Sequence, residues 1–222
     1  MASRAIKYRH QTASFFHSRT RLKIGLIGGS FNPAHAGHLH VAIEAHRQLG
    51  LDQIWLLVSP QNPLKTSADM APLDQRLAGA QVIAAPYPFL RVLAVEENLP
   101  NNYTYNTLNF MKKTMPLACL VWIMGADNLG QLAKWHRHQE LINLLPIAVI
   151  DRPSYSLQAI AAGKRLFRRR YKPANLKTAL AGRTGKLPAW CFIAGRKHTA
   201  SATAIRKREN YNTEHNTGIK TT

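Results

Sequence analysis

Residues 28–38 read GGSFNPAHAGH, and no other stretch says as much about the fold of this chain. They follow an apolar run at Leu22–Ile27, typical of a buried strand, and precede a helical pattern over Leu39–Leu49. Glycine lets backbone N–H groups approach an anion closely, and a helix N-terminus adds the positive end of its dipole. His35 and His38 lie at the mouth of this helix and can donate N–H groups to a phosphoryl oxygen. The stretch therefore predicts a phosphate-binding strand–turn–helix unit.

Strands and helices are predicted to alternate along the rest of the chain. Apolar runs that are mostly continuous indicate strands buried on both faces of a parallel sheet. The candidate strands are Leu22–Ile27, Gln53–Val58, Leu90–Val95, Ala118–Met124, Ile147–Ile150 and Trp190–Ala194, and the candidate helices are Leu39–Leu49, Asp74–Ala85, Tyr105–Met115 and His138–Leu144. This order predicts a Rossmann-like α/β fold with a doubly wound, mainly parallel sheet and helices on both faces. Ligands of such folds bind at the carboxyl ends of the strands.

The length of 222 residues suits one α/β domain, which we expect over residues 23–210. Residues 1–22 form a basic extension, compatible with either a disordered segment or a transit peptide, and residues 211–222 form a polar tail. A basic insertion is expected around residues 154–188, where residues 164–170 suit either a short helix or a mobile loop. No apolar run is long enough for a membrane span.

The charge of the chain is extreme, at +19, and its two cysteines lie in apolar runs. Between Arg152 and Arg208 there is no Asp or Glu. Such a field attracts polyanions, including nucleotides, nucleic acid and membranes, without choosing among them. Cys119 and Cys191 are predicted to be buried thiols, which suits a reducing cytoplasm.

A polar stretch comes after each later strand candidate. They read SPQNPLK at 59–65, YTYNTL at 103–108, GADN at 125–128 with a tryptophan at 135, DRP at 151–153 and SATAIR at 201–206. Because the carboxyl ends of parallel strands meet at one edge of the sheet, these residues are expected to converge on the 28–38 turn.

This ordered set resembles the nicotinate mononucleotide adenylyltransferases, nucleotidyltransferases with a His-x-Gly-His motif. The likeness spans roughly Lys23 to Arg208. Residues 28–38 are similar to G-x-F-[D/N]-P-x-H-x-G-H, 60–65 to a Pro/Asn-rich loop with a lysine, 103–108 to Y-[ST]-x-x-T-L, 125–135 to G-x-D…W, 151–153 to an R-x-P turn and 201–206 to I-S-S-T-x-I-R. Asn32 replaces a frequent Asp, and Ala200 and Ala202 replace an Ile and a Ser of the last motif.

The resemblance implies transfer of the adenylyl group of ATP to nicotinate mononucleotide, which yields nicotinate adenine dinucleotide and pyrophosphate in NAD biosynthesis. It implies His35, His38 and Arg206 as catalytic residues and Mg²⁺ arriving with ATP. The implied ATP-binding residues are Gly28, Gly29, Ser30, Phe31, His35, Gly37, His38, Ser201, Thr203 and Arg206. The implied mononucleotide-binding residues are Asn62, Lys65, Tyr103, Thr104, Gly125, Asp127, Trp135 and Arg152. The expected partners are these two substrates and no specific nucleic acid or membrane; a homo-oligomer is compatible with the likeness.

Several alternatives stay open. Within the superfamily, the acceptor could be nicotinamide mononucleotide or pantetheine phosphate, although the G-x-D…W element favours a pyridine nucleotide. A basic nucleic-acid-binding protein is the alternative of another class, favoured by the charge but by no recognisable motif. Trp135 is either core or a stacking surface for a pyridine ring. Thr104 could be only a helix N-cap, and His136 and His138 are expected at the surface.

Overall fold

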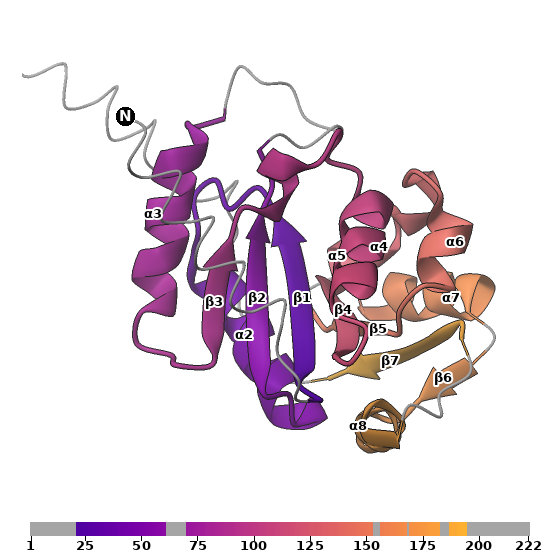
Figure 1. Cartoon of the computed structure of the whole chain (residues 1–222). Helices are drawn as coiled ribbons and strands as arrows, with labels where there is room; N and C mark the ends of the chain where they lie inside the picture. The colour runs from indigo at the N-terminus through magenta and orange to yellow at the C-terminus, as the bar shows by residue number, and fades with distance from the viewer. Residues whose placement is uncertain (1–20, 61–69, 153–155, 168, 183–186, 195–222) are drawn as a thin grey trace, which may run out of the picture.

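The computed structural model describes residues 21–60, 70–152, 156–167, 169–182 and 187–194. In this part of the chain a single parallel sheet forms the centre of the molecule (Figure 1). Its strands are β1 (Lys23–Gly29), β2 (Gln53–Val58), β3 (Leu90–Leu93), β4 (Cys119–Gly125), β5 (Ile147–Ile150), β6 (Arg169–Tyr171) and β7 (Ala189–Ile193). The strand order is β3-β2-β1-β4-β5-β7-β6, and every neighbouring pair is parallel. The predicted fold class is confirmed.

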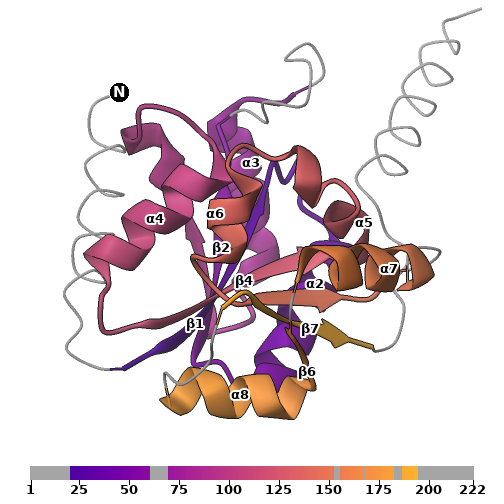
Figure 2. The same ribbon diagram turned by 90° about the vertical axis from the view of Figure 1, so that its right-hand side faces the viewer.

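Helices cover both faces of the sheet (Figures 1 and 2). One face packs against α2 (Ala36–Leu49), α3 (Leu73–Ala84) and α8 (Pro173–Gly182). The other packs against α4 (Thr104–Thr114), α5 (Ala126–Leu129), α6 (His138–Ile142) and α7 (Ser156–Leu166). Two short 3₁₀ helices, η2 (Val95–Asn98) and η3 (Leu132–Lys134), complete the described elements.

Burial on both faces explains the continuous apolar runs. All seven residues of β4 are buried, and so are all of β5 and β7. Side chains alternate between the two cores: Leu26 and Trp55 lie in one, and Ile27 and Ile54 in the other. A strand sandwiched in this way has no polar face, so its sequence shows no alternation.

Element boundaries differ little from the predicted ones. The strands at 53–58 and 147–150 are confirmed residue for residue, and β3 ends at Leu93 because Val95 already begins η2. Helix α2 begins at Ala36, ahead of the first apolar residue of its stripe, Leu39. Both cysteines are buried and free, as predicted, and burial raises the pKa of Cys191 to about 12.

The described residues within 154–188 hold more regular structure than the sequence indicated. Helix α7 ends at Leu166, β6 begins at Arg169, and α8 follows. Strand β6 lies at one edge of the sheet beside β7. It was missed because it is three residues long and its two arginines are exposed, so it carries no apolar run. No helix among the described residues is both long and apolar enough to cross a membrane.

Candidate active site

The candidate site lies where the strand order reverses. From β1 the chain builds outward to β2 and β3, and it then returns to pair β4 with the other side of β1. In open α/β sheets, ligands bind outside the carboxyl ends of the strands at such a switch point. Here β1 ends at Gly29, within the 28–38 turn, and β4 ends at Gly125.

His35 and His38 cap the N-terminus of α2 reciprocally. His35 is the N-cap residue, and its Nδ1 accepts a hydrogen bond from the Gly37 N–H at 3.0 Å. His38 Nδ1 accepts the N–H of His35 at 3.3 Å. Because both Nδ1 atoms act as acceptors, each neutral ring carries its proton on Nε2. The rings lie 3.9 Å apart, with His35 buried and His38 half-buried.

The turn itself is tightly packed. Phe31 adopts the left-handed region at φ 47°, although it is buried, and its ring lies 4.7 Å from that of His38. A left-handed aromatic residue is uncommon and typical of functional turns. A Cβ on Gly28 would collide with the indole of Trp122 in β4. Close packing against β4 therefore requires glycine at position 28. The sequence had indicated a different reason for this glycine, the approach of an anion to the backbone.

A second polar cluster follows β4 and β5. Arg152 lies 3.5 Å from Asp127, and both side chains are partly exposed. A Cβ on Gly125 would collide with the Asp127 carboxylate and lie 2.7 Å from Arg152 Nε. The glycine of the G-x-D element therefore makes room for a carboxylate and a guanidinium that converge above it.

Aromatic contacts bring α4 and the segment after α5 together. Tyr103, before α4, stacks on His136 with ring centroids 4.3 Å apart. The guanidinium of Arg137 lies 4.2 Å from the ring centroid of Tyr105. Trp135 is half-buried against the core, and its ring lies 6.5 Å from that of Trp122 in an edge contact.

One expectation for this region needs correction. Thr104 is the first residue of α4 and not its N-cap; Tyr103 occupies the cap position, with no side-chain cap hydrogen bond. His136 is exposed as expected but stacks on Tyr103, whereas His138 is half-buried at the start of α6.

Among the described residues, the buried side-chain atoms that lack a hydrogen-bond partner are Glu96 Oε2, Trp122 Nε1 and Asp127 Oδ1. Trp122 packs on Gly28 and Asp127 on Gly125, so two of the three residues flank the switch point. Such groups are rare in folded proteins, and each calls for an explanation, such as a catalytic role or a bound water or ion.

Glu96 is a site residue that sequence reasoning missed. Its Oε1 accepts the hydroxyl of Thr107 at 2.9 Å. Burial raises the pKa of Glu96 above its usual range, and hydrogen bonds from Ser59 and Thr107 oppose that shift. The sequence did carry a signal for Glu96: the chain has only 11 acidic residues, and this glutamate comes shortly after a predicted strand.

Arg76 in α3 is the other residue that was missed. It is only 4% exposed, and it donates to the carbonyls of Ser30 and Ser59. The signal in the sequence was its position at helical spacing from apolar residues, because Arg76 lies on the same buried face of α3 as Leu77 and Ala80.

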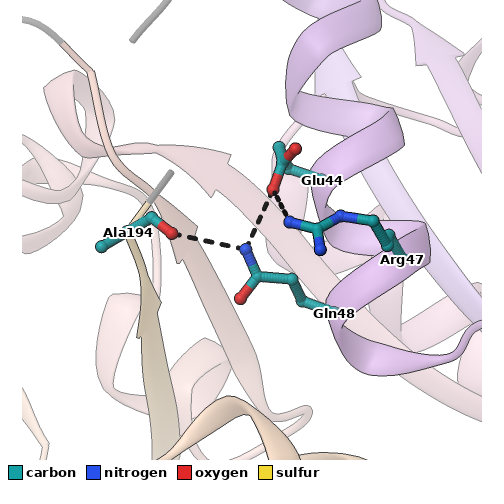
Figure 3. Close-up of polar contacts among 4 residues, drawn as sticks. All are labelled: Glu44, Arg47, Gln48 and Ala194. Carbon is teal, nitrogen blue, oxygen red and sulfur yellow. Dashed lines mark hydrogen bonds and ion pairs between the residues drawn. The ribbon is translucent and has the colours of Figure 1, made fainter. Parts of the chain in front are cut away.

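A polar contact joins α2 to the end of β7 (Figure 3). Gln48 Nε2 donates to Glu44 at 2.9 Å and to the carbonyl of Ala194 at 3.3 Å, while Arg47 pairs with Glu44 at 2.8 Å. The helix that His35 caps thus contacts the end of the strand that, in the sequence, precedes residues 201–206.

The structure describes most, but not all, of the predicted site residues. One group lies at and after the end of β1 and comprises Gly28, Gly29, Ser30, Phe31, His35, Gly37 and His38. The other lies at or beyond the ends of β3, β4 and β5 and comprises Tyr103, Thr104, Gly125, Asp127, Trp135 and Arg152. The remaining five, Asn62, Lys65, Ser201, Thr203 and Arg206, lie outside the described residues.

Comparisons with known proteins agree with this geometry. The cytidylyltransferase-like family model matches residues 26–208. A relative from Methylorubrum extorquens, named "Probable nicotinate-nucleotide adenylyltransferase", is 45% identical over 188 residues, which cover 84% of this chain and 100% of the relative. A relative of the same name from Gluconobacter oxydans is 44% identical over 84% of this chain and 94% of its own length.

The likeness extends to solved structures. Nicotinic acid mononucleotide adenylyltransferase of Plasmodium falciparum, solved in complex with NaAD, superposes with a TM-score of 0.63 at 16% identity over 84% of this chain and 83% of that chain. The same enzyme in complex with APC gives a TM-score of 0.62 at 15% identity. These structures support the fold, and the sequence relatives support the family. The chain belongs to the cytidylyltransferase-like family and, within it, to the nicotinate-nucleotide adenylyltransferases.

Proposed function

We propose that this protein transfers the adenylyl group of ATP to nicotinate mononucleotide, releasing pyrophosphate and nicotinate adenine dinucleotide for NAD biosynthesis. The observation that carries the proposal is the reciprocal capping of α2 by His35 and His38 at the switch point of the sheet. It occurs in a chain that aligns along the whole length of a curated relative with this activity in its name.

The turn after β1 is the proposed ATP phosphate site. Gly28, Gly29, Ser30, Phe31 and Gly37 supply a backbone that an anion can approach, at the N-terminus of a 14-residue helix. With Nδ1 used for capping, His35 and His38 hold their Nε2 protons as donors for phosphoryl oxygens. We assign the leaving β- and γ-phosphates to Ser201, Thr203 and Arg206.

The reaction needs no general base. The attacking group is a phosphate oxygen that is already ionised at neutral pH, so positioning and charge stabilisation are the available means of catalysis. Donation from neutral imidazoles suits this chemistry, because charge grows on the α-phosphate and on the leaving oxygen during the displacement. His35, His38 and Arg206 are the proposed catalytic residues.

The mononucleotide is assigned to the residues that follow β2 to β5. Tyr103 and Thr104 begin α4, Trp135 offers a half-buried ring, and Arg152 supplies positive charge beside Asp127. Gly125, Asn62 and Lys65 complete the set. We expect the acid form to be preferred, because a carboxylate accepts from the backbone N–H groups at strand and helix ends where a carboxamide would present its own donor.

ATP is proposed to enter as its Mg²⁺ complex. Mg²⁺ keeps several waters and is held largely by substrate phosphates, so it requires few protein ligands. The buried free thiols support a reducing compartment, and we propose the cytoplasm.

One assay tests the proposal. The purified protein is given Mg-ATP with nicotinate mononucleotide, nicotinamide mononucleotide or pantetheine phosphate, and pyrophosphate release is followed. We expect the highest kcat/KM with the nicotinate form. An equal or higher value with the amide would move the assignment to the amide, and no pyrophosphate with any acceptor, together with salt-sensitive binding of random oligonucleotides, would favour the nucleic-acid alternative.

A further inference from the structure

Arg76 is a buried cation whose partners, among the described residues, are all backbone carbonyls. Its Nε donates to Ala71 at 2.8 Å. One terminal nitrogen donates to Ser30 at 2.7 Å and to Ser59 at 2.6 Å, and the other donates to Pro60 at 2.7 Å. A planar guanidinium fork can serve several acceptors in fixed directions, which a lysine cannot do.

These carbonyls belong to segments that are distant in the sequence but adjacent in the site. Ser30 is part of the turn after β1, and Ser59 and Pro60 directly follow β2. The Ser59 N–H also donates to the carbonyl of Gly29 at 2.9 Å. Arg76 therefore fastens the carboxyl ends of β1 and β2 beyond the point where strand pairing ends, at Gly29 and Val58.

The connection continues from Ser59 toward the mononucleotide side. The Ser59 and Thr107 hydroxyls both donate to the carboxylate of Glu96. The Thr107 N–H donates to the carbonyl of Tyr103 at 3.2 Å, one of the contacts that close the first turn of α4. Polar contacts thus run without a break from the phosphate turn to the residue that stacks on His136.

Arginine is a costly residue at this position if stability is its only role. Arg76 lies on the buried stripe of α3, where a leucine would fill the space without desolvating a charge. Burial lowers the pKa of Arg76, although a guanidinium remains protonated. The free-energy cost of burying this charge is offset by its hydrogen bonds to loop carbonyls, which lie beyond the paired residues of the strands.

We propose that Arg76 is a positioning residue for the adenylyl transfer proposed above, on which this inference rests. It holds the turn after β1 and the loop after β2 in one arrangement and, through Ser59 and Glu96, sets that arrangement against the start of α4. Both substrates are thereby presented in register for in-line attack.

The test is Arg76→Lys, which keeps the charge and removes the fork. The matched control is Arg91→Lys, since Arg91 also donates to carbonyls, those of Pro88 and Leu90, near the opposite end of the sheet. We expect Arg76→Lys to lower kcat/KM by about tenfold to a hundredfold, because small misplacements of reacting groups have effects of this size. Arg91→Lys should stay within about twofold of the wild type. A folded Arg76→Lys protein within about twofold of the wild type overturns the proposal.

A second variant covers the case in which Arg76→Lys does not fold. Ser59→Ala removes only the hydroxyl that links the loop to Glu96, and the carbonyl that accepts from Arg76 remains. We expect the KM of the mononucleotide to rise about threefold or more and the KM of ATP to change less, as the loss of one hydrogen bond would allow. Unchanged values for both substrates would contradict the proposed link.

Amide hydrogen exchange separates this proposal from the proposed function. In Arg76→Lys, exchange of the Ser59 amide should quicken by about tenfold or more, while exchange in β4 stays as in the wild type. This readout needs no turnover, so it decides whether Arg76 holds the loops even if the wild-type protein releases no pyrophosphate. Unchanged exchange at Ser59 would show that the guanidinium does not hold them.

Discussion

The two sides of the switch point are built by different forces. After β1 and β2, the turn is held by backbone hydrogen bonds, a capped helix and the buried Arg76. Around α4 and Trp135, ring contacts dominate, and Tyr103 and His136 are exposed. Fixed dipoles and donors suit phosphate, whose charge must be met at set positions. Aromatic faces tolerate small shifts and suit a flat ring. We therefore expect catalysis to depend on the first side and the choice of acceptor to depend on the second.

Replacing His38 should have the largest effect. We expect His38→Ala to lower kcat by on the order of a hundredfold with a smaller change in the KM of ATP, because this donor meets charge that develops in the transition state. Steady-state kinetics of pyrophosphate release measure both constants.

His38 also caps α2, so stability must be separated from chemistry. His38→Gln retains an acceptor for the His35 N–H and should recover the melting temperature but not kcat. His46→Ala, near the other end of α2, is the matched control: it removes a stack on Phe89 and should lower stability with kcat near wild type. Near wild-type turnover by His38→Ala would remove the catalytic assignment.

Adding a methyl group at Gly125 should have the next largest effect. In Gly125→Ala, the new Cβ collides with Asp127 and presses on Arg152, so that pair must separate. We expect the kcat/KM of the mononucleotide to fall by about tenfold, a typical result of displaced positioning groups. Gly130→Ala is the control, because a Cβ there meets nothing within 4 Å. Equal effects of the two substitutions would mean that the Asp127–Arg152 pair does not position substrate.

Replacing Trp135 tests the side of the site where ring contacts dominate. If its half-buried ring stacks on the pyridine, Trp135→Ala should weaken the mononucleotide by about 1 kcal/mol and change ATP binding less. Isothermal titration with each substrate separates the two affinities. Lost thermal stability with unchanged mononucleotide affinity would instead assign Trp135 to the core, against which it also packs.

Glu96 should give the smallest effect, a pH dependence of stability. Burial raises its pKa above 4.5 in the folded protein, so the folded state binds this proton more tightly than the unfolded chain does. The resulting contribution to stability is complete below the unfolded pKa and is lost as the pH rises through the folded pKa. The melting temperature of the wild type should therefore fall relative to that of Glu96→Gln as the pH is raised above 4.5. A difference that is constant with pH would show that Glu96 has an ordinary pKa.

Much of the fold and part of the candidate site followed from the sequence, because their signals are local. Periodicity located six strands and four helices to within a few residues, and the strands at 53–58 and 147–150 matched at both ends. The 28–38 turn was recognisable because its glycines, histidines and flanking elements are contiguous. The roles predicted for all of the site residues remain predictions, and Asn62, Lys65, Ser201, Thr203 and Arg206 lie outside the described residues.

The order of the elements and the turn that we assign to phosphate could be read from the sequence, since backbone periodicity and helix capping depend on residues a few positions apart. The contacts of Arg76 became visible only in the folded chain, because its acceptors lie between 5 and 46 residues away along the sequence. The place of β6 at the sheet edge and the stacking of His136 on Tyr103 also became visible only there. Which side chains are buried, and which groups they contact, depends on segments that come together only once the sheet has formed. Local sequence patterns carry no information about such long-range contacts.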